Sequence, residues 1–175
     1  MQVLACPFRS RTRLVILSLV LIGPVLLFAS LVIFNSGGSN EAKQFNAELR
    51  KAAQELFVGY TQPVREVSQR TIVICKRVSP GSDVPDCARF INTIRDGDDT
   101  ISTTITRLDT LLASPPPEVS QSVLTQMREI LSLLQALRDS NHLLIEGWYE
   151  MNEAKWQEAW AHRESLAQEI GKLRD

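Results

Sequence analysis

The sequence has few of the residues that metal, haem and nucleophilic sites require. Its 175 residues include only two histidines and three cysteines, so a haem or zinc site has few ligands to draw on. It contains no Cys-x-x-Cys-His segment, no glycine-rich phosphate loop, no Gly-x-Ser-x-Gly and no His-Glu-x-x-His. We therefore expect no enzyme activity and no resident cofactor.

Acidic residues are absent from the first 40 positions, and residues 14–34 carry no charge of either sign. As a helix rising about 1.5 Å per residue, this apolar run would span about 30 Å, the thickness of the hydrocarbon core of a lipid bilayer. Arg9, Arg11 and Arg13 precede it. The positive-inside bias then predicts a single-pass protein of the cell membrane, in which residues 1–13 form a short basic cytoplasmic tail.

A cleavable signal peptide is the alternative interpretation of the same run. The apolar region of a signal peptide is usually about 7–15 residues long, which is shorter than residues 14–34. Ser36 and Gly38 would nevertheless suit a signal peptidase. The length favours a retained transmembrane anchor, whereas cleavage would make the chain a secreted helical protein.

The chain after the apolar run divides into a Gly/Ser-containing flexible linker, residues 35–40, and one extracytoplasmic domain, residues 41–175. All 20 acidic residues lie in this domain, against 16 of the 19 Lys and Arg, since three of those precede the run, so its net charge is about −4. This mild acidity gives no reason to expect nucleic acid as a partner.

Helical spacing of apolar residues continues through nearly the whole domain, and no alternating strand pattern exceeds a few residues. The fold class expected is all-α: one N-terminal transmembrane helix followed by an extracytoplasmic antiparallel four-helix bundle with coiled-coil-like packing. The four helices are expected at about 41–78, 84–113, 117–150 and 153–174.

Several positions mark where these helices bend or end. The apolar stripe of the first helix slips by one residue near Gly59 and Pro63, which predicts a kink. Asp83 is expected to cap the second helix, Pro117 to lie at or near the start of the third, and Asn152 to cap the fourth. The third helix is expected to continue through 139–142, with a break there as the alternative.

Cys75 and Cys87 are close in sequence, at the end of the first expected helix and the start of the second. In an oxidising compartment we expect them to form a disulfide that closes the mouth of the helical hairpin. The alternatives are two buried thiols and a redox-active pair, although the spacing is far from Cys-x-x-Cys.

His142, Glu146 and Glu150 follow one another at four-residue spacing and share one face of the third helix. Such spacing can bring metal ligands together. Glu146 points away from the apolar stripe, however, and metal sites in bundles face inward. These residues are therefore weak metal candidates, and a solvated helix face is the favoured interpretation.

Three polar residues occupy stripe positions that otherwise face the core: Asp98, Asn141 and Arg163. Buried polar residues in helical bundles often fix the register of the helices at some cost in stability. We expect such a role here, with Asp98 and Arg163 able to pair across the core. A functional polar pocket is the alternative.

The aromatic residues Trp148, Tyr149, Trp156 and Trp160 cluster around the turn between the third and fourth helices. They could fill the core near one end of the bundle, or they could form an edge that binds a partner, since Trp and Tyr carry much of the energy of protein interfaces. Trp160 lies beside the apolar stripe, so the sequence predicts that it is the exposed anchor.

These features favour a binding or structural subunit, such as an accessory component of a membrane protein complex, whose partner is another membrane protein. The alternative is an extracytoplasmic bundle that senses a ligand or binds a metal or small molecule. A sensing receptor needs a cytoplasmic output, and the 13-residue tail is too short to supply one.

Overall fold

The computed structural model describes residues 39–172, apart from the side chains of residues 69, 70 and 170–172. The expected tail, 1–13, and the apolar run, 14–34, lie outside this range, so the anchor stays a prediction. The described residues are all-helical and include no strand. None of the helices in this described part combines the length and the apolar character that a membrane span requires.

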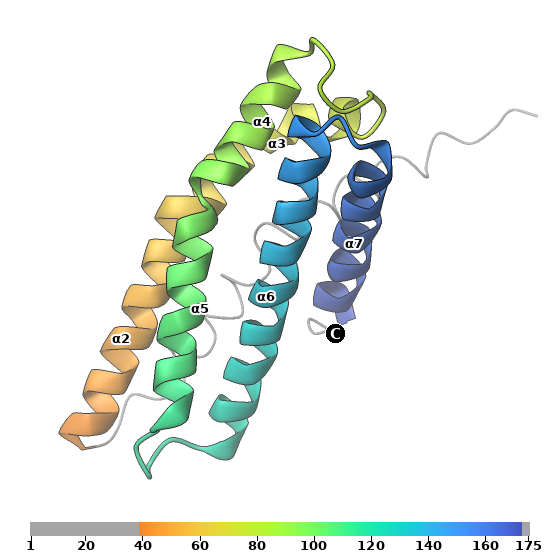
Figure 1. Ribbon diagram of the computed structural model, residues 1–175. Helices are drawn as coiled ribbons and strands as arrows, with labels where there is room; N and C mark the ends of the chain where they lie inside the picture. Colours follow the sequence, from red (N-terminus) through yellow and green to blue (C-terminus); the bar gives the residue numbers. More distant parts are fainter. Residues whose placement is uncertain (1–38, 173–175) are drawn as a thin grey trace, which may run out of the picture.

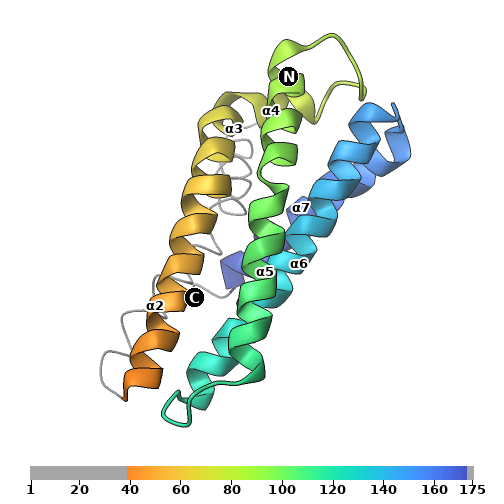
Figure 2. The same cartoon turned by 60° about the vertical axis from the view of Figure 1, so that its left-hand side comes forward.

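The helices form four rods that lie side by side and alternate in direction along the chain (Figure 1). A view turned by 60° shows the same arrangement, and the fourth rod accompanies α6 for only part of its length (Figure 2). The rods are, in order, α2 (Asn40–Leu56) with η1 (Phe57–Thr61) and α3 (Gln62–Cys75); α4 (Pro85–Asp96) with α5 (Asp98–Ala113); α6 (Gln121–Tyr149); and α7 (Glu153–Lys172).

The first rod begins one residue earlier than the sequence predicts. Ser39 caps α2 by accepting a hydrogen bond from the backbone N–H of Ala42 at 3.3 Å, so Asn40 belongs to the helix and not to the linker. The kink expected near Gly59 and Pro63 takes the form of a single π-turn, η1. Because a π-turn accommodates one extra residue, it accounts for the one-residue slip of the apolar stripe.

The second rod corrects two predictions. The chain does not run as one continuous helix over 84–113, because Gly97 separates α4 from α5. Val84, in an extended conformation, precedes the first helical residue, Pro85, so Asp83 is not the N-cap. Proline suits the first helical position because its missing N–H would have no partner there.

The third rod begins later than expected. Ser120 caps α6 by accepting a hydrogen bond from the backbone N–H of Val123 at 3.4 Å, so Pro117 does not start the helix. From there α6 is continuous through residues 139–142, as its hydrophobic period indicates. Asn152 caps α7, accepting from the N–H of Lys155 at 3.1 Å, as predicted.

A disulfide joins Cys75, at the end of α3, to Cys87, in the first turn of α4. The two Cα atoms lie 5.4 Å apart, and both residues are fully buried. The bond closes the loop between the first two rods at the end of the molecule where the α6–α7 turn also lies (Figure 1). This end is therefore covalently fixed.

Candidate functional site

Four irregular or polar positions, one from each rod, meet inside the molecule. Tyr60 of η1, Asn141 of α6 and Arg163 of α7 are each at least 98 % buried, and we call these three residues the polar layer. Gly97, between α4 and α5, lies against the Tyr60 ring. Because π-turns occur often at functional sites, their coincidence with a buried polar layer makes this a candidate site.

Asn141 is the centre of the polar layer. Its Oδ1 accepts a hydrogen bond from the Tyr60 hydroxyl at 3.2 Å and a second one from Nη2 of Arg163. Only the oxygen of an amide can accept, so these two donors fix the orientation of the Asn141 side chain. The layer therefore ties the first, third and fourth rods together in one register.

Arg163 brings a charge into the core, where its guanidinium meets the amide oxygen of Asn141. No ion pair to Arg163 is present among residues 39–172, and its Nε has no hydrogen-bond partner there. An unpaired buried charge costs several kcal/mol. The prediction that Asp98 pairs with Arg163 across the core is wrong, because the Arg163 guanidinium donates its hydrogen bond to Oδ1 of Asn141 on α6 instead.

Asp98 pairs with His142, at the edge of the polar layer. Its Oδ2 lies 2.9 Å from Nε2 of His142, which is adjacent in sequence to Asn141. Asp98 is also the first residue of α5, where a negative charge is stabilised by the helix dipole. The interruption at Gly97 thus places this carboxylate at a helix N-terminus, facing α6.

Two glycines permit the first and second rods to approach closely at the layer. A Cβ on Gly97 would lie 2.7 Å from Cδ2 of Tyr60, and one on Gly59 would lie 2.7 Å from Oγ1 of Thr100. Real Cβ atoms do not approach other atoms so closely, so neither position accepts a larger side chain without movement. The glycines serve packing here and not backbone freedom.

The structure does not assemble the weak metal candidates His142, Glu146 and Glu150 into a site. His142 faces Asp98, while Nζ of Lys155 donates to Glu146 at 2.8 Å and to Glu150 at 2.9 Å. The described residues contain no group of three or more His, Cys, Asp or Glu that could hold a metal ion.

The Lys155 ammonium changes the ionisation of its surroundings. Its hydrogen bond and its charge lower the pKa of Glu146 below the ordinary 4.5. The hydrogen bonds to Glu146 and Glu150 raise the pKa of Lys155. Glu146 and Glu150 are exposed and Lys155 is only partly buried, so solvent screens the interaction and the structural contribution is small.

The tryptophans fill the core, and the prediction that Trp160 is an exposed anchor is wrong. Trp160 is 1 % exposed and its ring stacks on Phe90, while Trp156 contacts both Trp160 and Trp148. Trp148 is also buried. Trp160 is buried although it lies beside the apolar stripe of α7, because its ring reaches Phe90 of α4.

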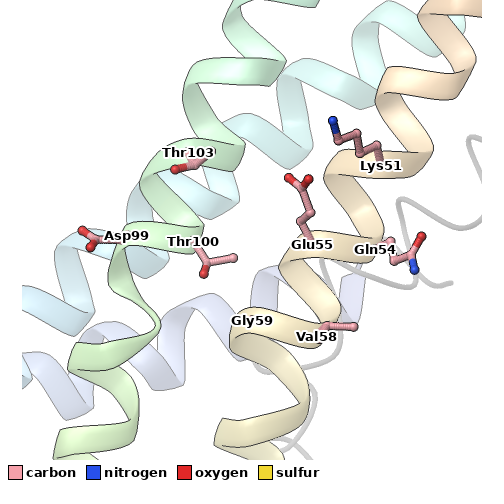
Figure 3. A pocket seen from close by; sticks show the side chains of 8 residues that line it. All are labelled: Lys51, Gln54, Glu55, Val58, Gly59, Asp99, Thr100 and Thr103. Atoms are coloured by element: carbon pink, nitrogen blue, oxygen red, sulfur yellow. The ribbon is translucent and has the colours of Figure 1, made fainter.

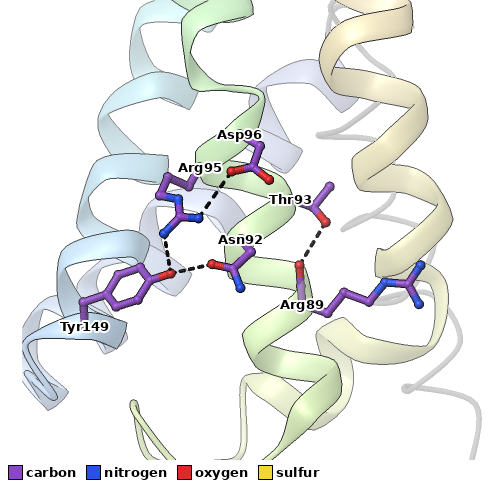
Figure 4. Close-up of polar contacts among 6 residues, drawn as sticks. All are labelled: Arg89, Asn92, Thr93, Arg95, Asp96 and Tyr149. Carbon is purple, nitrogen blue, oxygen red and sulfur yellow. Dashed lines mark hydrogen bonds and ion pairs between the residues drawn. The ribbon is translucent and has the colours of Figure 1, made fainter.

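Tyr149 is the member of the aromatic cluster that reaches solvent. Its hydroxyl accepts a hydrogen bond from Nη1 of Arg95 at 2.9 Å and donates one to Oδ1 of Asn92 (Figure 4). The Arg95 guanidinium also lies over the ring, 5.7 Å from its centre. Tyr149 nevertheless remains 51 % exposed, so it is a solvent-facing aromatic held in a fixed orientation.

Met151 extends this surface into the α6–α7 turn. It is 72 % exposed and has a φ of 53°, an uncommon value for a residue with a side chain. Its side chain lies close to Gly81 in the α3–α4 loop, where a Cβ would be 2.8 Å from the Met151 Cγ. We call the surface formed by Asn92, Arg95, Tyr149 and Met151 the tip face.

A second surface feature is an open groove of about 640 Å³ between α2 and α5 (Figure 3). Lys51, Glu55 and Thr103 are among its lining residues. Nearby, Nη1 of Arg107 donates to Glu55 at 2.7 Å. Because the lining carries both signs of charge, the groove indicates no particular class of ligand.

Sequence reasoning missed two parts of these sites. Tyr60 lies on the apolar stripe of the first helix, but nothing in the sequence shows that its hydroxyl meets Asn141, 81 residues away. Arg95 and Asn92 gave no signal as partners of Tyr149, because a contact across 54 or more residues depends on the packing of separate helices. The stripe positions of Asn141 and Arg163 were the usable signals for the layer.

Comparison of the chain with protein-family models, with curated proteins and with solved structures finds no match in any of the three.

Proposed function

We propose that this chain is a membrane-anchored binding or structural subunit that engages another membrane protein through the tip face. In this proposal residues 14–34 span the bilayer with residues 1–13 in the cytoplasm, and the rest forms an extracytoplasmic antiparallel four-helix bundle. The bundle is thereby held close to the membrane surface, where other membrane proteins expose their outer domains.

Two features support the location. The uncharged run at 14–34 has the length of a membrane span, and the arginines before it favour a cytoplasmic N-terminus. The Cys75–Cys87 disulfide agrees with this orientation, since disulfides persist in oxidising compartments outside the cytoplasm.

The observation that carries the binding proposal is the exposure of Tyr149 in a fixed orientation. Arg95 and Asn92 hold its hydroxyl, so binding a partner would order few additional degrees of freedom. Tyr, Arg and Met, which together compose most of the tip face, are enriched in protein interfaces. The disulfide fixes the same end of the molecule, which limits its movement on binding.

The test is co-purification of the full-length chain from gently solubilised membranes. We expect a stoichiometric membrane protein with the wild type and a ratio of partner to chain that is at least about tenfold lower for Tyr149→Ala, the loss typical of an interface hot spot. The control is Val58→Ala, which removes an exposed apolar side chain on η1, away from the tip face, and should leave the ratio unchanged.

Two results would count against this function. If Tyr149→Ala and Val58→Ala retain the partner equally, the tip face is not the binding surface. If the wild-type chain emerges alone from solubilised membranes, the subunit proposal itself fails. Circular dichroism of each variant confirms that a loss of partner is not a loss of fold.

A further inference from the structure

We propose that the polar layer is a binding site for a small inorganic anion, a halide such as chloride, with Arg163 and Asn141 as its principal ligands. The inference concerns the interior of the helical domain and does not depend on the proposed function. It rests on buried donors that have no acceptor among residues 39–172.

The first step is the direction of the Asn141 amide. Because Oδ1 accepts from both Tyr60 and Arg163, the amide cannot be turned over without losing both hydrogen bonds. Its Nδ2 is therefore a donor, and it is buried with no partner among the described residues. An unmatched buried donor of this kind is uncommon in a folded protein and calls for an acceptor.

The second step is the charge of Arg163. Its guanidinium is 98 % buried, keeps its positive charge and has an Nε without a partner in the described part of the chain. A buried charge is normally paired or neutralised. Elsewhere on α7, the indole Nε1 atoms of Trp156 and Trp160 are also buried donors with no partner among the described residues. On Asn141 and Arg163 the unpartnered atoms are donors, and one of these side chains is a cation, which is the chemistry that binds anions.

The third step is size. Asn141, Trp160 and Arg163 are between 98 % and 100 % buried, so a large carboxylate or phosphate ester could not reach them without opening the core. A halide is small and accepts hydrogen bonds from several N–H groups without a preferred orientation. This combination of burial and donors favours a halide over organic anions.

The rival acceptor is Asp98, whose Oδ1 is also buried without a partner. Its Oδ2 is engaged by His142 at 2.9 Å, and no ion pair joins Asp98 to Arg163 in residues 39–172. If the Arg163 guanidinium turned toward Asp98 in solution, that pairing would replace the anion. The experiment must therefore distinguish an anion from this carboxylate.

The experiment measures thermal unfolding of the full-length chain in detergent, in sodium chloride and in sodium gluconate at matched ionic strength. Gluconate is too large to reach donors that are at least 98 % buried, so the proposal predicts a saturable rise in Tm of about 3–6 °C in chloride alone. Arg163→Met should abolish this response. Arg65→Met, which removes an exposed arginine on α3, should retain it.

Equal Tm values in the two salts, or a chloride response that survives Arg163→Met, would overturn the proposal. If Arg163→Met fails to fold, wild-type crystals soaked in bromide decide the question through the anomalous signal of bromine. We expect a bromide within hydrogen-bond distance of Arg163 and Asn141. An adventitious bromide only at the surface, or a guanidinium paired with Asp98, would overturn the proposal as well.

Discussion

The Tyr60 hydroxyl donates a hydrogen bond to Oδ1 of Asn141 at 3.2 Å and thereby joins two helical rods through the middle of the core. Tyr60 reaches this position because it lies in the π-turn η1, and Gly97 of the second rod leaves room for its ring. The π-turn of the first rod, the break at Gly97 in the second and the polar residue Asn141 in the third thus meet at one place in the core.

Tyr60→Phe should destabilise the protein by about 1–2 kcal/mol, because a buried acceptor on Asn141 loses one of its two donors while the ring stays in place. Urea unfolding followed by circular dichroism measures this difference. Tyr149→Phe removes a hydroxyl from an exposed ring and should change stability by less than about 0.5 kcal/mol. Equal effects of the two substitutions would show that the buried hydrogen bond contributes little.

The sign of the stability change caused by Gly97→Ala distinguishes an effect of packing from an effect of helix propensity. Propensity alone would make alanine stabilising by up to about 1 kcal/mol. The Cβ would lie 2.7 Å from Cδ2 of Tyr60, so we expect a loss of about 1–3 kcal/mol instead. A smaller loss in a Tyr60→Leu background would confirm through a double-mutant cycle that the tyrosine ring is the obstacle. A gain in stability would contradict the close approach of the two rods.

Replacing both Cys75 and Cys87 with alanine should lower the free energy of unfolding by about 3 kcal/mol, since the bond closes a loop with a sequence separation of 12. Chemical denaturation of the variant and of the wild type, with and without reductant, measures this value. Peptide mapping under non-reducing conditions should recover the two cysteines in one linked fragment. Their recovery as separate thiols would rule the disulfide out.

Lys155→Met should raise the pKa of Glu146 toward its ordinary 4.5, because the hydrogen bond and charge that lower it are gone. A lowered folded-state pKa stabilises the fold above pH 4.5, and this contribution is lost as the pH falls through the folded value. NMR titration of the Glu146 carboxyl carbon checks the shift. Lys51→Met, on the distant α2, should leave the titration unchanged.

Apolar periodicity predicted the helical character and much of the path of the chain. The one-residue slip of the stripe at Gly59 located η1, and an unbroken stripe carried α6 through a polar segment at 139–142. These predictions succeed because periodicity records which side of a helix is buried, and burial is what stabilises these helices.

Apolar periodicity could not predict where the helices end or which groups the polar side chains contact. At Gly97, where the second rod is interrupted, the Tyr60 ring of another rod packs against the backbone. Helix α6 starts where Ser120 forms the N-cap, and not at the prolines before it. The prediction that Trp160 faces solvent rested on its place beside the apolar stripe, and the stripe does not show that Phe90 of α4 covers the ring. Such errors reflect contacts between segments far apart in the sequence.

The central claim is that the chain remains anchored in a membrane and works there as a subunit. Native mass spectrometry of the full-length chain, extracted from membranes in mild detergent, tests it most directly. We predict a complex with one other membrane protein in fixed stoichiometry, in which the chain retains residues 14–34. A mature chain that begins near Ser39, or an anchored chain recovered only as a monomer, would contradict this account.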